Sequence, residues 1–227
     1  MDNSKPFLEM EEAFTTRLQS AETQLERRHY RKPEFLLTPE DKAWLQESFE
    51  RRLPVEIEIG CGKGKFMTAR AETFPHVRCV AIERVGKWLN LGKARAAKRG
   101  LSNLLFLMND AREIIRREVP PASVQAFHIY FPDPWPKRRH QKRRLITADL
   151  LLLLYHRLIS GGKLHLATDH EIYLGFIRQA IQESKLPWAI QENRSRPSQE
   201  GLQAKTNYEL KYEAAGRTLY YLDLQRP

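Results

Sequence analysis

Short apolar runs alternate with helical stretches from residue 54 onward, and this alternation constrains the fold more than any other feature of the sequence. The runs cover residues 55–59, 78–82, 103–108, 124–131 and 163–167, and each ends in polar, charged or glycine residues. Apolar runs separated by helices predict a parallel sheet that is covered on both faces. Right-handed crossovers then bring the carboxyl ends of the strands to one edge, where ligands bind in such sheets.

Two further runs, 188–191 and 218–224, are predicted to complete a seven-stranded, mostly parallel sheet. A leucine-rich helix is expected over 145–159, and the pair Gly161-Gly162 is expected to break the chain before the fifth strand. The chain has 227 residues, of which 41% are apolar, and this is enough for a buried core. We therefore expect one α/β domain over residues 51–227. Residues 1–50 are mixed in charge and contain few apolar runs, so we expect an N-terminal extension that is helical or partly disordered.

The sequence shows no membrane span, secretion signal or metal site. Its longest leucine-rich run, 150–155, is far shorter than the roughly 18 apolar residues of a transmembrane helix, and residues 1–10 contain no apolar signal stretch. The two cysteines, Cys61 and Cys79, lack the spacing of a zinc site or of a disulfide framework. We expect a cytoplasmic protein that binds neither a membrane nor a metal.

A glycine-rich loop, Gly60-Cys61-Gly62-Lys63-Gly64, links the first predicted strand to a helix that begins near Lys65. Glycines allow the backbone to approach a ligand closely, and a helix N-terminus favours an anion. The third glycine comes one residue too early for a dinucleotide fingerprint, and no Gly-Lys-Ser or Gly-Lys-Thr follows as in a P-loop. NAD and ATP are therefore disfavoured as ligands.

Three acidic residues stand at the same predicted edge: Glu58 before the glycine loop, Glu83 after the second strand and Asp110 after the third. They would repel a triphosphate, whereas carboxylates accept hydrogen bonds from ribose hydroxyls and hold cationic groups. The pattern resembles that of the Rossmann-like class I S-adenosylmethionine-dependent methyltransferases. This resemblance implies that Glu83 binds the ribose, Asp110 the adenine amine, and Glu58 with Gly60 the methionine end of S-adenosyl-L-methionine.

Positive charge is concentrated in one octapeptide. The chain has 38 Lys and Arg against 28 Asp and Glu, a net charge of +10, and residues 137–144 alone contain six cations and no acid. This octapeptide follows Asp133, a carboxylate that stands between two prolines on a stiff backbone. Its cations suit phosphates, so we expect an anionic partner. The basic residues of 84–100 are interpreted instead as the solvated face of a helix.

The string Phe131-Pro132-Asp133-Pro134-Trp135-Pro136-Lys137 and its basic continuation resemble the bacterial tRNA (guanine-N7)-methyltransferase family, as do residues 168–173 and 206–209. The likeness covers roughly residues 50 to 227. It implies methyl transfer to N7 of a tRNA guanine, at position 46 in tRNA numbering, with Asp133 as the catalytic residue beside the cofactor. It also implies substrate contacts by Lys137, Asp169, Thr206, Asn207, Tyr208 and Glu209, and RNA contacts by Arg139, His140, Gln141, Lys142, Arg143 and Arg144. Tyr208 and His170 stand where many members have Phe and Trp.

Two other functions remain open from the sequence. An exocyclic-amine methyltransferase places an acid, two prolines and an aromatic residue after the fourth strand, whereas Asp133-Pro134-Trp135 has one proline between acid and aromatic ring. A non-catalytic RNA-binding protein on the same fold is disfavoured because the acids of the edge are all present. With tRNA as the expected partner, both a monomer and a homodimer remain open.

Overall fold

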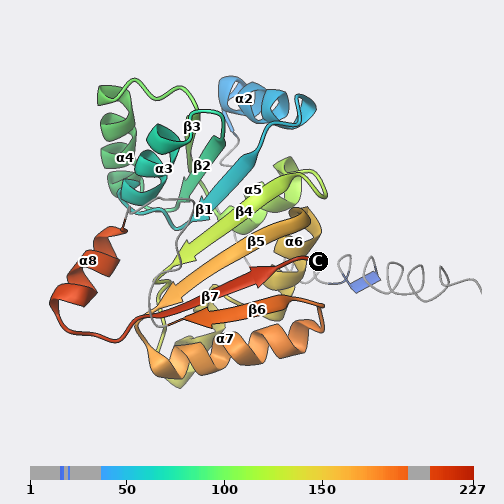
Figure 1. Ribbon diagram of the computed structural model, residues 1–227, viewed down its shortest axis with the longest axis vertical. Helices are drawn as coiled ribbons and strands as arrows, with labels where there is room; N and C mark the ends of the chain where they lie inside the picture. The colour runs from blue at the N-terminus through green and yellow to red at the C-terminus, as the bar shows by residue number, and fades with distance from the viewer. Residues whose placement is uncertain (1–15, 18–19, 21–36, 194–204) are drawn as a thin grey trace, which may run out of the picture. The chain divides into compact units, whose positions relative to one another are not determined.

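The computed structural model describes residues 16–17, 20, 37–193 and 205–227 (Figure 1). Residues 35–227 form one compact unit. Most of the extension expected over residues 1–50 lies outside the described residues, and the domain boundary at residue 50 stays a prediction. The longest described part of that extension is helix α2 (Pro39–Glu50), which begins at the N-cap Thr38 and packs Leu45 into the same core as the strands.

The sheet has seven strands in the order β3-β2-β1-β4-β5-β7-β6 (Figure 1). In chain order they are β1 (Val55–Ile59), β2 (Arg78–Glu83), β3 (Leu104–Met108), β4 (Val124–Tyr130), β5 (Leu158–Thr168), β6 (Ala189–Asn193) and β7 (Tyr220–Gln225). Strands β1 to β5 pair in parallel, and β7 runs antiparallel to both β5 and β6. The predicted seven-stranded, mostly parallel sheet is therefore confirmed.

Helices cover both faces of this sheet, as the continuous apolar strands predict. One face is covered by α3 (Lys65–Thr73) and α4 (Gly86–Lys98), and the other by α5 (Ala111–Glu118), α6 (Ala148–Arg157) and α7 (Glu171–Ser184). The 3₁₀ helix η1 (Arg138–Arg143) follows β4, and α8 (Asn207–Ala214) precedes β7. Alternate residues of β2 separate the two layers, because Val80 packs into the core formed with α5, α6 and α7, and Ala81 into the core formed with α3 and α4. None of the helices in the described ranges is long and apolar enough to cross a membrane.

The predicted break at Gly161-Gly162 lies inside β5 rather than before it. Leu158 pairs with Val124, and the next paired residue, Lys163, is already opposite Ala126, so β5 carries a bulge of extra residues. Gly161 has a φ of +77°, and a side chain on Gly162 would lie 2.9 Å from the carbonyl oxygen of Ile159. The glycines thus allow the strand to continue through a bulge, which a sequence pattern does not distinguish from a turn.

Candidate active site

The carboxyl ends of β1 to β5 lie along one edge of the sheet (Figure 1). The winding direction changes between β1 and β4, because β2 and β3 extend the sheet on one side of β1 whereas β4 and β5 extend it on the other. Ligands of such sheets bind at this switch point. The carboxylates predicted from the sequence all come from this edge: Glu58, Glu83, Asp110, Asp133 and Asp169.

The glycine loop after β1 leaves space for a ligand against its backbone. Gly60, Gly62 and Gly64 have φ angles of +79°, +54° and +64°, which L side chains rarely adopt. A Cβ atom on Gly60 or Gly62 would meet no atom within 4 Å, whereas one on Gly64 would lie 2.6 Å from the ring of Phe106. The loop is tied to β2, because the Gly60 N–H donates to the carbonyl oxygen of Ile82 at 2.8 Å. Open space on one side and close packing on the other suit a bound group.

Glu83 is held in position by backbone donors. Its Oε2 accepts from the Gly62 N–H at 2.9 Å, and its Oε1 accepts from the N–H groups of Arg84 and Val85 at 2.7 and 2.9 Å. An ionised carboxylate has about four acceptor positions, two on each oxygen, so Oε2 can still accept a hydrogen bond from a ligand. Glu83 is therefore oriented before any ligand binds and links the glycine loop to the end of β2.

Glu58 and Asp110 flank this position. The Glu58 side chain is buried. Burial of the Cys61 thiol raises its pKa well above its usual value, and the nearby charge of Glu58 adds to this increase. Asp110 is the N-cap of α5, where Oδ1 accepts from the Arg112 N–H at 3.0 Å and Oδ2 lies 3.9 Å from the Arg84 guanidinium. Within the described ranges, no group of three His, Cys, Asp or Glu side chains is placed to hold a metal ion.

Asp133 lies on an unusual loop that follows β4. Its side chain is exposed, and the residues two before and two after it, Phe131 and Trp135, have positive φ angles of 52° and 42°. Such angles are rare for aromatic residues and store strain that the surrounding structure must support. The Phe131 N–H donates to the carbonyl oxygen of Ala167 on β5 at 2.8 Å, and its ring packs edge-on against Tyr212 at 5.5 Å. The loop therefore presents Asp133 from a constrained backbone.

Two residues that the sequence reasoning missed, Tyr212 and Arg217, lie beside Asp169. Arg217 forms an ion pair with Asp169, and its guanidinium lies 4.7 Å over the ring of Tyr212. Burial raises the pKa of Tyr212, and the charges of Asp169 and Asp133 contribute in the same direction. The spacing of Tyr208 and Tyr212, four residues apart on α8, is a signal that would have indicated Tyr212, whereas nothing in the sequence marks Arg217.

The segment 206–209 divides into two buried and two exposed residues. Thr206 and Glu209 form a capping box at the start of α8, and the Glu209 Oε1 also accepts from the Tyr221 hydroxyl at 2.9 Å. Glu209 is completely buried, whereas Asn207 and Tyr208 are exposed. His170 similarly caps α7, with its Nδ1 accepting from the Tyr173 N–H at 3.2 Å. Substrate contact by residues 206–209 stays a prediction, and the structure gives two of them a role in forming the helix.

The basic octapeptide forms η1, and its residues differ in exposure. The exposed residues of η1 are Arg138, Arg139, Lys142 and Arg143, and Lys137 before the helix is exposed as well, whereas His140 and Gln141 are half-buried. The ring of His140 lies edge-on to that of Trp135 at 5.6 Å, and the Arg143 guanidinium lies 5.1 Å above the same indole. Arg144 lies apart from them, because its side chain is buried against the loop that carries Asp133.

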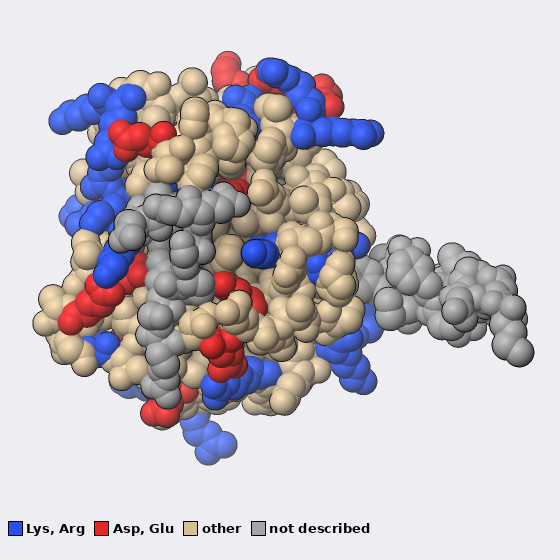
Figure 2. All heavy atoms as spheres, viewed as in Figure 1, with Lys and Arg blue, Asp and Glu red and all other residues tan. Residues whose placement is uncertain are grey.

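Lys and Arg side chains also gather over α4 (Figure 2). This helix buries Leu89, Gly92 and Ala96 against the sheet and exposes Lys93 and Lys98. Within the basic stretch 84–100, the exposed lysines of α4 therefore lie on the solvent side of a surface helix, as their spacing indicates.

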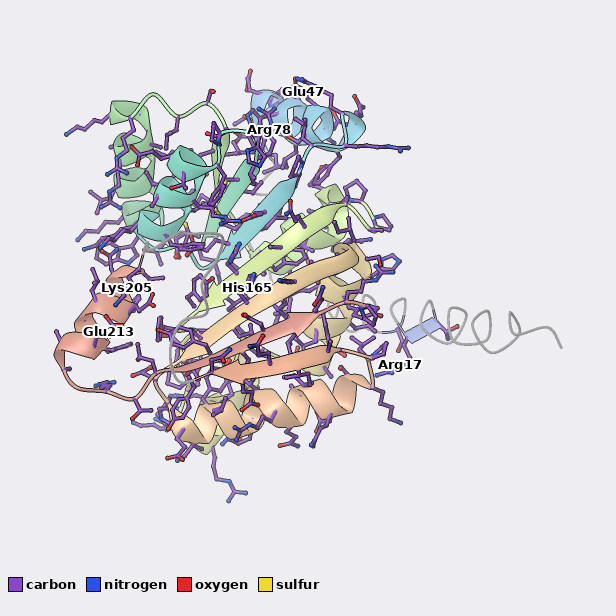
Figure 3. The ribbon with its side chains drawn as sticks, viewed as in Figure 1. Arg17, Glu47, Arg78, His165, Lys205 and Glu213 are labelled. Atoms are coloured by element: carbon purple, nitrogen blue, oxygen red, sulfur yellow. The ribbon has the colours of Figure 1, made fainter. Side chains whose placement is uncertain are left out.

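A buried polar network that the sequence did not reveal crosses the sheet beneath α3. Arg70 on α3 donates from Nε and Nη2 to both carboxylate oxygens of Glu56 on β1, at 2.8 and 2.6 Å. His128 on β4 lies with Nε2 3.0 Å from Glu56 and Nδ1 3.0 Å from the Tyr130 hydroxyl. Its ring also stacks on His165 of β5 at 5.1 Å, in the middle of the sheet (Figure 3). Because a carboxylate only accepts, Nε2 carries the proton and Nδ1 accepts from Tyr130.

This network predicts a loss of stability at mildly acidic pH. Burial lowers the pKa of His128 from 6.5 to about 4, with Glu56 opposing this change. Between these values the unfolded chain binds a proton that the folded chain does not, so the free energy of unfolding should fall as pH decreases. The full effect is about 3 kcal/mol.

Urea unfolding of the wild type and of His128→Gln at pH 7, 5.5 and 4.5 measures this effect. Glutamine keeps an N–H donor toward Glu56 but does not titrate, so its unfolding free energy should depend less steeply on pH. His156, whose pKa is also lowered to about 4 by burial, contributes equally in both proteins. Equal pH dependence in the two proteins would contradict the assignment.

Comparisons with known proteins agree with this architecture. The model of the family described as "Putative methyltransferase" matches residues 52–222. Among solved structures, an antibiotic-related methyltransferase superposes with a TM-score of 0.55 at 19% identity, covering 85% of this chain and 95% of the other. A precorrin-6y C5,15-methyltransferase from Geobacter metallireducens gives 0.54 at 15% identity, covering 87% and 94%. At these identities the structural matches show the fold alone.

Sequence relatives are closer. A tRNA (guanine-N(7)-)-methyltransferase from Mycobacterium avium is 34% identical over 178 residues, covering 74% of this chain and 64% of the relative. One of the same name from Nitrosomonas eutropha is 42% identical over 129 residues, covering 57% and 58%. The chain thus spans less than two thirds of the length of these curated relatives. Since the family model covers most of the chain and the fold agrees with it, the protein belongs to the methyltransferase family that this model describes as "Putative methyltransferase".

Proposed function

We propose that the protein transfers a methyl group from S-adenosyl-L-methionine to N7 of a guanine in tRNA, by resemblance the guanine at position 46. One observation carries the proposal: Asp133 stands on a constrained loop between the acidic edge of the sheet and the exposed cations of η1. The edge suits a cationic cofactor and η1 suits phosphate, so the two ligands would meet at Asp133. The names of the relatives from Mycobacterium avium and Nitrosomonas eutropha support this substrate.

The residues of the edge fit the cofactor. Glu83, which is already oriented by backbone donors, would bind the ribose through Oε2, Asp110 the adenine amine, and Glu58 with the open loop at Gly60 the methionine end. When bound, S-adenosyl-L-methionine supplies a methyl group on a positively charged sulfonium. The negative charge of the three acids favours a positively charged ligand and disfavours a triphosphate.

Guanine N7 has a lone pair that is available without removal of a proton. The site therefore needs to orient the base and to stabilise the positive charge that develops on the ring. Asp133 is exposed and can accept hydrogen bonds from the N1 and N2 donors of guanine. The rings of Tyr208 and Tyr212 are 5.9 Å apart, and Tyr212 lies close enough to Asp169 for this charge to raise its pKa. They would form the wall against which the base stacks.

The exposed cations of η1 would bind the RNA backbone. Structured RNA is recognised at loops and exposed bases, because the A-form major groove is too narrow for side chains. A tRNA base held in a tertiary pair must first be exposed, at a cost of a few kcal/mol. With a tRNA substrate the protein would act in the cytoplasm.

Replacing three of the four exposed cations of η1 should weaken binding of every tRNA and reduce its dependence on salt. In the variant Arg139→Gln/Lys142→Gln/Arg143→Gln, the log–log slope of affinity against salt should lose about 2 to 3 units if each cation meets one phosphate. Fluorescence anisotropy of labelled tRNA across a salt series measures the slope. Arg51→Gln/Arg52→Gln, at the opposite edge of the sheet, serves as the control. An unchanged slope in the η1 variant would show that RNA binds elsewhere.

The proposed function is tested by incubating undermethylated tRNA with labelled S-adenosyl-L-methionine. N7-methylguanosine makes the tRNA sensitive to borohydride followed by aniline, so the expected result is cleavage of the tRNA at one guanosine. Label transfer without cleavage would indicate an exocyclic-amine methyltransferase. Binding of tRNA without any transfer would indicate an RNA-binding protein on the same fold. Either of these results would overturn the proposal.

A further inference from the structure

Arg144 is the last cation of the basic octapeptide, and its surroundings differ from those of the others. It is 5% exposed, and its Nε donates to the carbonyl oxygen of Pro134 at 2.9 Å. Its Nη2 lies 3.4 Å from the carbonyl oxygen of Trp135, and its guanidinium lies 3.6 Å over the ring of Phe176. The side chain therefore faces the loop that carries Asp133 and is turned away from solvent.

The loop that Arg144 contacts needs external support. Positive φ angles at Phe131 and Trp135 are unfavourable for these residues and persist only where the surroundings enforce them. Pro134 and Trp135 directly follow Asp133, so hydrogen bonds to their carbonyl oxygens restrain the backbone next to that residue. A guanidinium can donate to two neighbouring carbonyls at once through its planar fork, whereas an ammonium acts as a point charge.

The backbone beside Arg144 is anchored as well. Its own N–H donates to the carbonyl oxygen of Gln141 at 3.0 Å, and Nη2 of Arg112 donates to the carbonyl oxygen of Leu145 at 2.8 Å. The next residue, Ile146, donates its N–H to the hydroxyl of the fully buried Tyr173 at 3.4 Å. These contacts fix the chain on both sides of Arg144 and hold its guanidinium between α7 and the Asp133 loop.

We propose that Arg144 is a positioning residue that holds Asp133 in its working orientation, and that it is not an RNA contact. The proposal rests on the proposed function, since it assumes that Asp133 acts on the substrate. The same short segment then has two tasks: η1 presents cations to RNA, and Arg144 immediately after it sets the geometry of the reacting site.

The variant Arg144→Lys separates positioning from RNA binding, because it keeps the charge and loses the fork. At saturating tRNA we expect kcat to fall by about 10- to 100-fold, since a displacement of the order of 1 Å is enough for such a loss. The salt slope of tRNA binding should stay unchanged in Arg144→Lys and in Arg144→Gln. The matched control is Arg143→Gln, which should lower the slope by about 0.7 to 0.9 units. A slope in Arg144→Gln that falls as in Arg143→Gln, with kcat unchanged, would overturn the proposal.

A double-mutant cycle tests whether Arg144 acts through Asp133. In single-turnover reactions, Arg144→Lys should have little further effect in the Asp133→Asn background, because the group that it positions is no longer a carboxylate. If the two substitutions reduced the rate by independent factors that multiply, Arg144 would act by another route and the proposal would fail.

Hydrogen exchange gives a readout that does not depend on activity. In Arg144→Lys the segment 131–137 should exchange faster, while the strands exchange as in the wild type. If Arg144→Lys loses the fold, Phe176→Leu replaces it, because that variant keeps the guanidinium and removes the ring beneath it. Unchanged exchange in this segment would contradict the proposal. Failure of the wild type to methylate tRNA would instead overturn the proposed function and leave the exchange result standing.

Discussion

Asp133→Asn should reduce the single-turnover rate of methyl transfer by about 10²- to 10³-fold, comparable to the loss of one preorganised electrostatic contact in other enzymes. Asparagine has nearly the same shape but no charge, and its NH₂ group donates where the carboxylate accepts. The guanine N1 and N2 donors would then lose an acceptor, and the positive charge that develops on the ring would lose its counterpart. Because Asp133 is exposed, the folded state should keep its stability.

Rapid quench of labelled methyl transfer, with enzyme in excess over tRNA, measures this rate. Affinities for tRNA and for S-adenosyl-L-methionine are measured in parallel, so that weakened binding is not mistaken for slow chemistry. Glu47→Gln is the control, since this carboxylate lies on α2 beside Arg78, at the amino end of β2 (Figure 3). A near-normal rate in Asp133→Asn would rule out the electrostatic role of this residue.

Glu56→Ala should have the largest effect on stability and lower the free energy of unfolding by about 3 to 5 kcal/mol. Glu56 and Arg70 are both buried, with side-chain exposures of 1% and 6%. Burial alone would raise the pKa of Glu56, but hydrogen bonds from His128 and Arg70 outweigh it and lower this pKa to about 2. Alanine would leave the Arg70 charge buried without its carboxylate, and the cost of an uncompensated charge exceeds that of the lost contacts.

Glu47→Ala provides the comparison, because Glu47 also pairs with arginines but at the surface. It contacts Arg51 at 2.7 Å and Arg78 at 2.8 Å, and its side chain is 48% exposed. Exposed pairs contribute about 0 to 1 kcal/mol, so this variant should unfold nearly as the wild type does. Urea unfolding followed by far-UV circular dichroism measures both. Similar losses in the two variants would show that burial does not set the value of these ion pairs.

A double variant in the same network tests whether the stability loss in Glu56→Ala comes from the charge that remains on Arg70. Replacing both charged partners, as in Glu56→Leu/Arg70→Met, removes the pair without leaving one charge behind and should recover much of the lost stability. His128 would then lose its acceptor, so recovery should be incomplete. If the double variant were no more stable than Glu56→Ala, the loss would come from packing and not from the unpaired charge.

Much of the fold follows from local patterns. The strand β1 was predicted with the boundaries that the structure shows, and β2 to β4 differ by one residue at one end. Short-range hydrophobic patterning decides these elements, and the handedness of crossovers then brings their carboxyl ends together. For the same reason the sequence alone placed Glu83, Asp110 and Asp133 at one edge.

The helix-capping residues were harder to assign. Thr206 and Glu209 have the three-residue spacing of a capping box, yet the resemblance to a known family implies that they contact the substrate. A helix cap and a substrate contact are both compatible with these two residues. In the structure Glu209 is completely buried and accepts a hydrogen bond from Tyr221 of β7, which gives it a structural role. Only the folded sheet brings these two residues together.

The sequence by itself determined the parallel sheet, the edge that carries the acids and the basic segment beside Asp133, because these depend on periodicity and order along the chain. Only the tertiary structure decided which groups are buried together. Glu56 and His128 are 72 residues apart and meet across neighbouring strands, and Arg144 is sequestered while the adjacent Arg143 stays exposed. Identical side chains in one basic run acquire different roles because burial depends on what packs against each of them, which a linear pattern does not contain.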